Sequence, residues 1–165
     1  MQGAWPGHGL KEAELGPAEG GPSGSTLSGE PSGETVPMLT LRLDGLRICD
    51  IPSFYDEINR VFMAGEDWRL GPSLDALDDM LRGGYGALHD AEEARVIWAE
   101  HAASAEALGV EVTRAQLLAK LEDPRFDQAI ARRKLDRLEA EGGPTYFDTV
   151  LEVFADHPRI ELVLA

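Results

Sequence analysis

The feature that most constrains the fold is the alternation of short apolar strands with helices after residue 37. Leucines at positions 39, 41 and 43 alternate as in a half-buried strand, residues 94–98 form a short apolar run, and residues 159–164 alternate again. Helical patterns separate these three stretches. Strands separated by helices favour a parallel sheet. The sequence therefore predicts a small α/β domain with a three-stranded parallel sheet flanked by helices.

Helix-capping residues divide the first half of this domain. Pro52 is expected to open a helix over residues 51–63, and Ser73 is expected to cap a second, short helix that Gly83 and Gly84 terminate. Between these helices, residues 65–72 read as a loop. An Ala-rich helix follows the middle strand, to about Leu108.

The second half of the domain is predicted to be mainly helical. Thr113 is expected to cap a helix over residues 114–121, and residues 124–141 to continue as a longer helix that ends at Gly142. Thr145 is then expected to cap the last helix. Trp98 and Phe154 are predicted to lie in the core.

Residues 1–37 differ in composition from the rest of the chain. They hold 9 of the 18 glycines and 5 of the 10 prolines, and they contain few aliphatic residues. Such a segment buries too little apolar surface to offset its conformational entropy. We therefore expect a disordered N-terminal tail over 1–37 and a folded domain over 38–165, with a translation start at Met38 as an alternative.

The charge of the chain restricts its partners. There are 15 Lys and Arg against 30 Asp and Glu, a formal net charge of −15. This excess repels phosphate backbones and anionic lipids, so neither nucleic acid nor a membrane surface is expected as a direct partner. The single cysteine, Cys49, cannot close an internal disulfide. Without a signal peptide or a transmembrane stretch, the expected location is the cytoplasm.

Three aspartates gather on the predicted short helix over residues 73–82. At 100° per residue, Asp75 and Asp79 lie opposite the stripe of Leu77 and Met80, and Asp78 lies at the border of that stripe. The helix is either an ordinary solvated face or a negative surface directed at a basic partner. Asp75 and Asp79 are like charges at i,i+4, a spacing that slightly destabilises a helix.

No catalytic or metal-binding pattern is apparent. The four histidines are scattered, and no cysteine pair or glycine-rich phosphate loop after a strand is present. We therefore expect a protein that is not an enzyme and that has no metal and no cofactor.

Several segments, in order along the chain, resemble the barstar family, whose members are small intracellular inhibitors of barnase-type ribonucleases. They are "LDGLRICDIPSF", "GPSLDALDDMLRGGY", "VIW" and "DTVLEVFADHPRIELVLA". The resemblance implies a barstar-like fold and a partner-binding surface in which carboxylates take the places of substrate phosphates. The implied contact positions are Asp75, Asp79, Gly83 and Asp156.

The aromatic contacts of the family are rearranged in this chain. Asp78 stands where the family has a contact tryptophan, and the family's loop tyrosine falls at Arg69, next to Trp68. The corner aromatic is displaced to Tyr85. These four residues complete the predicted partner-binding set.

Residues 109–144 have no counterpart in small members of the family and are predicted to be a helical insertion. They contain the basic residues Arg132, Arg133, Lys134 and Arg137, which usually are solvated or paired. The resemblance implies an inhibitor or immunity protein for a basic secreted ribonuclease, acting as a monomer or in a 1:1 complex. The alternative is a regulatory binding module with the same fold and a partner that is not a nuclease.

Overall fold

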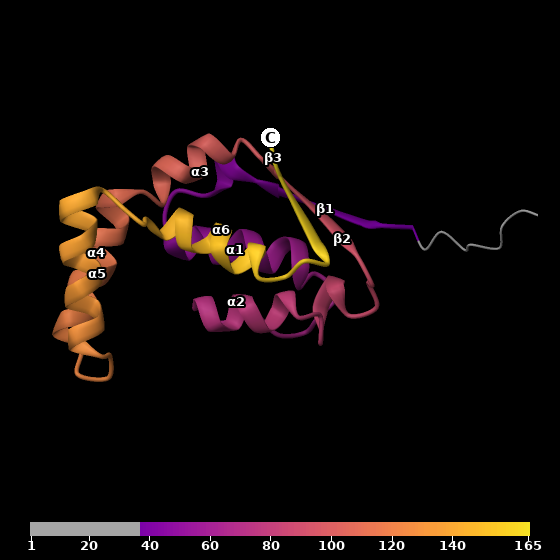
Figure 1. Ribbon diagram of the computed structural model, residues 1–165. Helices are drawn as coiled ribbons and strands as arrows, with labels where there is room; N and C mark the ends of the chain where they lie inside the picture. Colours follow the sequence, from indigo (N-terminus) through magenta and orange to yellow (C-terminus); the bar gives the residue numbers. More distant parts are fainter. Residues whose placement is uncertain (1–36) are drawn as a thin grey trace, which may run out of the picture. The chain divides into compact units, whose positions relative to one another are not determined.

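The computed structural model describes residues 37–165 and contains the predicted parallel sheet. The strands β1 (Leu39–Asp44), β2 (Ala94–Ala99) and β3 (Ile160–Leu164) lie in the order β1-β2-β3 (Figure 1). Both pairs are parallel, with Leu43 opposite Trp98 and Trp98 opposite Leu164. The α/β class and the three-stranded parallel sheet are confirmed. Residues 1–36, nearly all of the predicted tail, lie outside the described part of the chain.

One face of the sheet carries the core. Leu43, Val96 and Trp98 are fully buried, whereas the alternate residues Arg42 and Arg95 are exposed. Each strand therefore alternates between apolar and polar residues, unlike the continuous apolar runs of parallel strands that are covered on both faces.

Helices form the cover of the buried face. Following β1 are the short 3-10 helix η1 (Gly45–Arg47), α1 (Ile51–Phe62), α2 (Leu74–Leu81) and the 3-10 helix η2 (Gly86–Leu88). Following β2 are α3 (His101–Ala107), α4 (Val110–Glu122), α5 (Gln128–Glu141) and α6 (Tyr146–Ala155). Helix α1 contacts β1, α6 contacts β3, and α2 packs on α6.

Aromatic residues fill the centre of the core, as predicted for Trp98 and Phe154. The Trp98 ring stacks on Phe54 at 5.8 Å between centroids, and its indole N–H donates to Ser104 Oγ at 2.9 Å. Phe154 is 1% exposed. The hydrogen bond to Ser104 satisfies the one polar atom of the buried indole.

The predicted boundaries of α4 and α5 are wrong. Helix α4 begins at Val110 after Gly109, so Thr113 lies inside its first turn, where its hydroxyl donates to the Gly109 carbonyl at 2.7 Å. Helix α5 begins only at Gln128, and its cap is Asp127, whose carboxylate accepts from the Ile130 N–H at 3.0 Å. A turn at residues 123–127 separates the two helices, because Pro124 cannot continue the hydrogen bonding of α4.

Helices α4 and α5 form a hairpin with a small core of its own. Leu117, Leu135 and Leu138 are buried against one another. In Figure 1 the hairpin lies beside the start of α6, away from the sheet. The Tyr146 N–H joins this start to the hairpin by donating to Thr113 Oγ1 at 2.7 Å. The Phe147 N–H donates to the carbonyl of Leu108, just before the hairpin, at 3.1 Å.

Candidate functional site: an acidic face on α2 and α6

Helix α2 presents its carboxylates to solvent because its apolar stripe is buried. The Ala76 N–H donates to the cap, Ser73 Oγ, at 3.1 Å, which begins the helix as predicted. Leu77 and Met80 are 0% exposed. Asp75 and Asp79 therefore point outward, and the Asp79 side chain is 64% exposed.

A cavity of about 580 Å³ lies between α2 and the end of α6. It brings Asp156 of the predicted site together with Asp75 and Asp78 of α2, which lie far from it in the sequence. Asp79 lies outside this cavity, on the exposed side of the same helix. The full lining is Leu74, Asp75, Asp78, Arg82, Val153, Asp156 and His157.

Asp78 is engaged within the molecule. His157 Nε2 lies 2.8 Å from its Oδ1, and Arg82 Nη2 lies 2.6 Å from its Oδ2. The His157 hydrogen bond is the largest influence on Asp78 and lowers the pKa of that carboxyl below its ordinary value, against a smaller opposing effect of desolvation and with the help of Arg82. Asp78 thus joins α2 to the end of α6, and its predicted role as a partner contact stays a prediction.

Neither His157 nor its bond to Asp78 was expected from the sequence. His157 follows Asp156, the C-cap of α6, and is 9% exposed. No local sequence pattern links two residues 79 positions apart.

The corner after α2 depends on Gly83. This residue has a φ of +85°, and a Cβ added there would meet the guanidinium group of Arg159. The Arg159 guanidinium donates to the Leu81 carbonyl at 3.1 Å and to the Ala91 carbonyl at 2.8 Å. Arg159 therefore fixes the backbone next to the acidic face, a role that its sequence position did not indicate.

The predicted aromatic residues form a pair beside this corner. The rings of Trp68 and Tyr85 lie 4.8 Å apart between centroids, and Trp68 is 44% exposed. Arg69 instead pairs with Asp56 of α1 at 2.6 Å. With Trp68 it lines a different cavity, of about 580 Å³, next to α1. The structure thus separates Arg69 from the acidic cavity.

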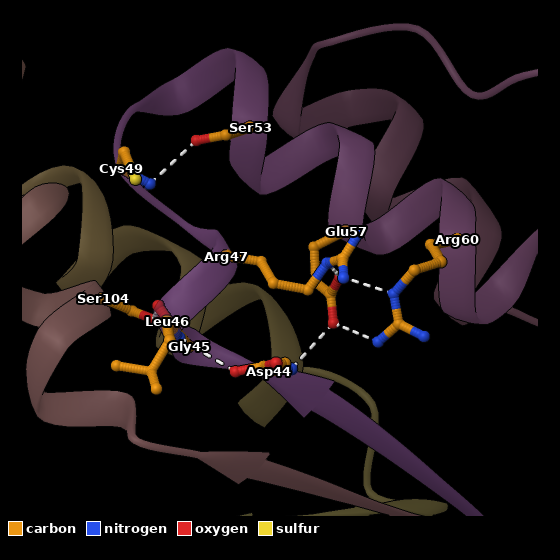
Figure 2. Close-up of polar contacts among 9 residues, drawn as sticks. All are labelled: Asp44, Gly45, Leu46, Arg47, Cys49, Ser53, Glu57, Arg60 and Ser104. Atoms are coloured by element: carbon orange, nitrogen blue, oxygen red, sulfur yellow. Dashed lines mark hydrogen bonds and ion pairs between the residues drawn. The ribbon is translucent and has the colours of Figure 1, made fainter.

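A second charged cluster, absent from the sequence prediction, surrounds Glu57 of α1. Its side chain is 1% exposed, yet Oε1 accepts from the Asp44 N–H at 2.7 Å, and Arg60 Nε lies 2.7 Å from Oε2. Figure 2 shows Arg47 and Arg60 reaching the carboxylate from two sides. Burial acts to raise the pKa of Glu57, but the hydrogen bonds from Arg60 and Asp44 outweigh it and hold the pKa below its ordinary value. The cluster joins the end of β1 to α1.

Residues 37–165 contain no group of three or more His, Cys, Asp or Glu side chains placed to hold a metal ion. None of the helices in this same range has the length and apolarity that a bilayer crossing requires.

The fold and the acidic face define the class of protein. A small three-stranded parallel sheet, covered by helices and bearing a short acidic helix, is the arrangement expected of a barstar-like inhibitor. Residues 38–129 match the family model described as Barstar (barnase inhibitor), and the chain belongs to this family. The matched residues include all of α4 and the first residues of α5. No protein among the curated ones matches the chain.

Members of the barstar family are inhibitors and not enzymes, which agrees with the expectation from the sequence. Family membership gives this chain the general role of a barnase inhibitor.

Proposed function

We propose that the protein binds a basic secreted ribonuclease of the barnase type and blocks its active site with the acidic face of α2. Asp79 is the central anchor, Asp75 is a second mimic of a substrate phosphate, and Asp156 is a supporting contact. In this role the protein acts in the cytoplasm as an immunity protein, in a 1:1 complex with the toxin, before the enzyme is secreted.

The observation that carries the proposal is the outward orientation of Asp75 and Asp79. The opposite stripe of α2 is buried, so these carboxylates are held on a fixed helix face and not on a mobile loop. Asp156 at the end of α6 lines the same cavity as Asp75. Carboxylates from two elements therefore face a common partner surface.

The net charge supports the same partner. At −15, the chain attracts a basic protein at long range and increases the rate of encounter. Asp79 has only one cation near it in the described residues, Arg82 at 3.8 Å. Its carboxylate is thus free to pair with a cation of the nuclease.

One observation favours the alternative, a regulatory module with a partner that is not a nuclease. Asp78 occupies the position of the family's contact tryptophan, and its carboxylate is bound to His157 and Arg82. This face therefore lacks a large apolar contact at that position, although the Trp68 and Tyr85 pair offers one nearby.

An RNA-cleavage assay separates the two functions. We expect the wild-type protein to inhibit a barnase-type ribonuclease at equimolar concentration, and the variant with Asp75→Ala and Asp79→Ala to inhibit weakly. Glu106→Ala on α3 is the control, because it removes an exposed carboxylate outside the acidic face. Absence of inhibition by excess wild-type protein, across a panel of such ribonucleases, would favour the regulatory alternative.

A further inference from the structure

A second cavity, of about 280 Å³, lies between the α4–α5 hairpin and the helices α6 and α2. We propose that it binds a small phosphate monoester. The proposal goes beyond inhibition of a nuclease and does not depend on it.

The cavity gathers positive charge in a strongly negative protein. Lys120 of α4 and Lys134 and Arg137 of α5 line it, against a single carboxylate, that of Glu152. Arg137 also pairs with Glu141 at 3.0 Å. Among residues 37–165, no ion pair includes either lysine, and the Lys120 ammonium group lies over the Phe126 ring, 5.3 Å from its centroid. Three cations around a cavity that one carboxylate lines favour an anionic ligand.

The pKa of Lys120 is lowered in this cavity. Burial is the main cause that lowers the pKa of its ammonium group, and the nearby charge of Lys134 lowers it further, while Asp75 acts in the opposite direction. A dianion bound between the two lysines would compensate both the repulsion and the loss of hydration.

The remaining walls suit an organic phosphate. Leu74, Leu117 and Tyr146 provide apolar surface, and Gln116 and Thr149 provide polar groups. The volume lies just below the range of about 300–1,000 Å³ that is typical of small-molecule sites, so a compact ligand is expected. The cavity is also less open to solvent than the one beside Asp156.

The walls are held in place by the contacts of the hairpin with α6. Thr113 Oγ1 accepts from the Tyr146 N–H at 2.7 Å, and both residues line the cavity. Leu74 lines both this cavity and the acidic one, so the two lie on either side of the start of α2.

Calorimetric titration with ribose 5-phosphate tests the proposal, with ribose as the uncharged comparison. We expect the wild-type protein to bind ribose 5-phosphate and not ribose. The variant Lys120→Ala with Lys134→Ala should bind at least about tenfold more weakly, because each lost charge-assisted hydrogen bond weakens binding. Both positions lie in helices, where alanine is well tolerated.

The matched control is Arg132→Ala with Arg133→Ala. Like the test variant, it removes two positive charges, but from residues of α5 that do not line the cavity. It should bind like the wild type, and amide signals of Leu74 and Thr149 should shift on titration. Equal losses in both double variants, shifts confined to other residues, or no binding of ribose 5-phosphate by the wild type would each overturn the proposal.

Discussion

At the scale of single residues, the buried carboxylate of Glu57 depends on polar contacts with three neighbouring residues. It accepts the Asp44 N–H at the end of β1, while its partners Arg47 and Arg60 remain about half exposed. The arginines can return to water if the carboxylate is lost, but the Asp44 N–H would then have no partner in this arrangement.

We therefore predict that Glu57→Ala lowers the free energy of unfolding by about 1–3 kcal/mol. Arg47→Ala, at an exposed side chain, should change it by less than about 1 kcal/mol. Chemical denaturation of both variants measures the difference. Equal effects of the two substitutions would mean that the ion pair matters more than the backbone hydrogen bond.

The link between Asp78 and His157 predicts a dependence of stability on pH. The pKa of Asp78 is lower in the folded protein than its ordinary value of 3.8, so the carboxylate stabilises the fold above that value, and the contribution is lost as the pH falls through the folded pKa. Asp78→Asn should therefore lower the melting temperature at pH 7, and the difference from the wild type should shrink below pH 3.8. Melting curves at pH 7 and pH 3 test this. A difference that is the same at both values would show that the charge of Asp78 is not the cause.

At the scale of secondary-structure elements, local sequence was enough to predict the sheet and α2. Strand alternation, the proline in the first turn of α1 (Pro52) and the caps Ser73 and Thr145 depend on neighbouring residues only. The start of α4 was missed because a threonine near the end of a loop resembles a cap, whereas Thr113 uses its hydroxyl to join α4 to α6.

Local sequence predicted the outward carboxylates of the candidate site but not its long-range contacts. The period of α2 indicated that Asp75 and Asp79 point outward. The contacts of His157 with Asp78 and of Arg159 with Leu81 join residues 79 and 78 positions apart, and no local pattern indicates such pairs.

The α4–α5 hairpin is expected to unfold separately from the sheet. Its core consists of three buried leucines and is separate from the main core. Leu135→Ala should cost about 2–5 kcal/mol, and the cost should fall on the hairpin alone. Hydrogen exchange should then be faster in α4 and α5 and unchanged in β2, and inhibition of the ribonuclease should stay within a few-fold. Faster exchange throughout the domain would show that the hairpin and the sheet unfold together.

At the scale of the whole molecule, net charge and the acidic face act on different steps of binding. The charge of −15 accelerates encounter with a basic enzyme, and this effect weakens with salt because the Debye length falls from ~10 Å at 0.1 M to ~3 Å at 1 M. A carboxylate paired with a buried cation of the partner acts instead on the rate of dissociation. The two contributions can therefore be measured separately.

The central claim is that Asp79 anchors the nuclease, and binding kinetics of Asp79→Ala to a barnase-type ribonuclease at 0.1 M and ~1 M salt test it most directly. We expect a faster dissociation at both salt concentrations and a loss of about 2–5 kcal/mol of binding free energy. The melting temperature should stay unchanged or rise slightly, since repulsion from Asp75 is relieved. Glu106→Ala should dissociate like the wild type. A folded Asp79→Ala variant that binds with wild-type kinetics would contradict the account and leave α2 an ordinary solvated helix.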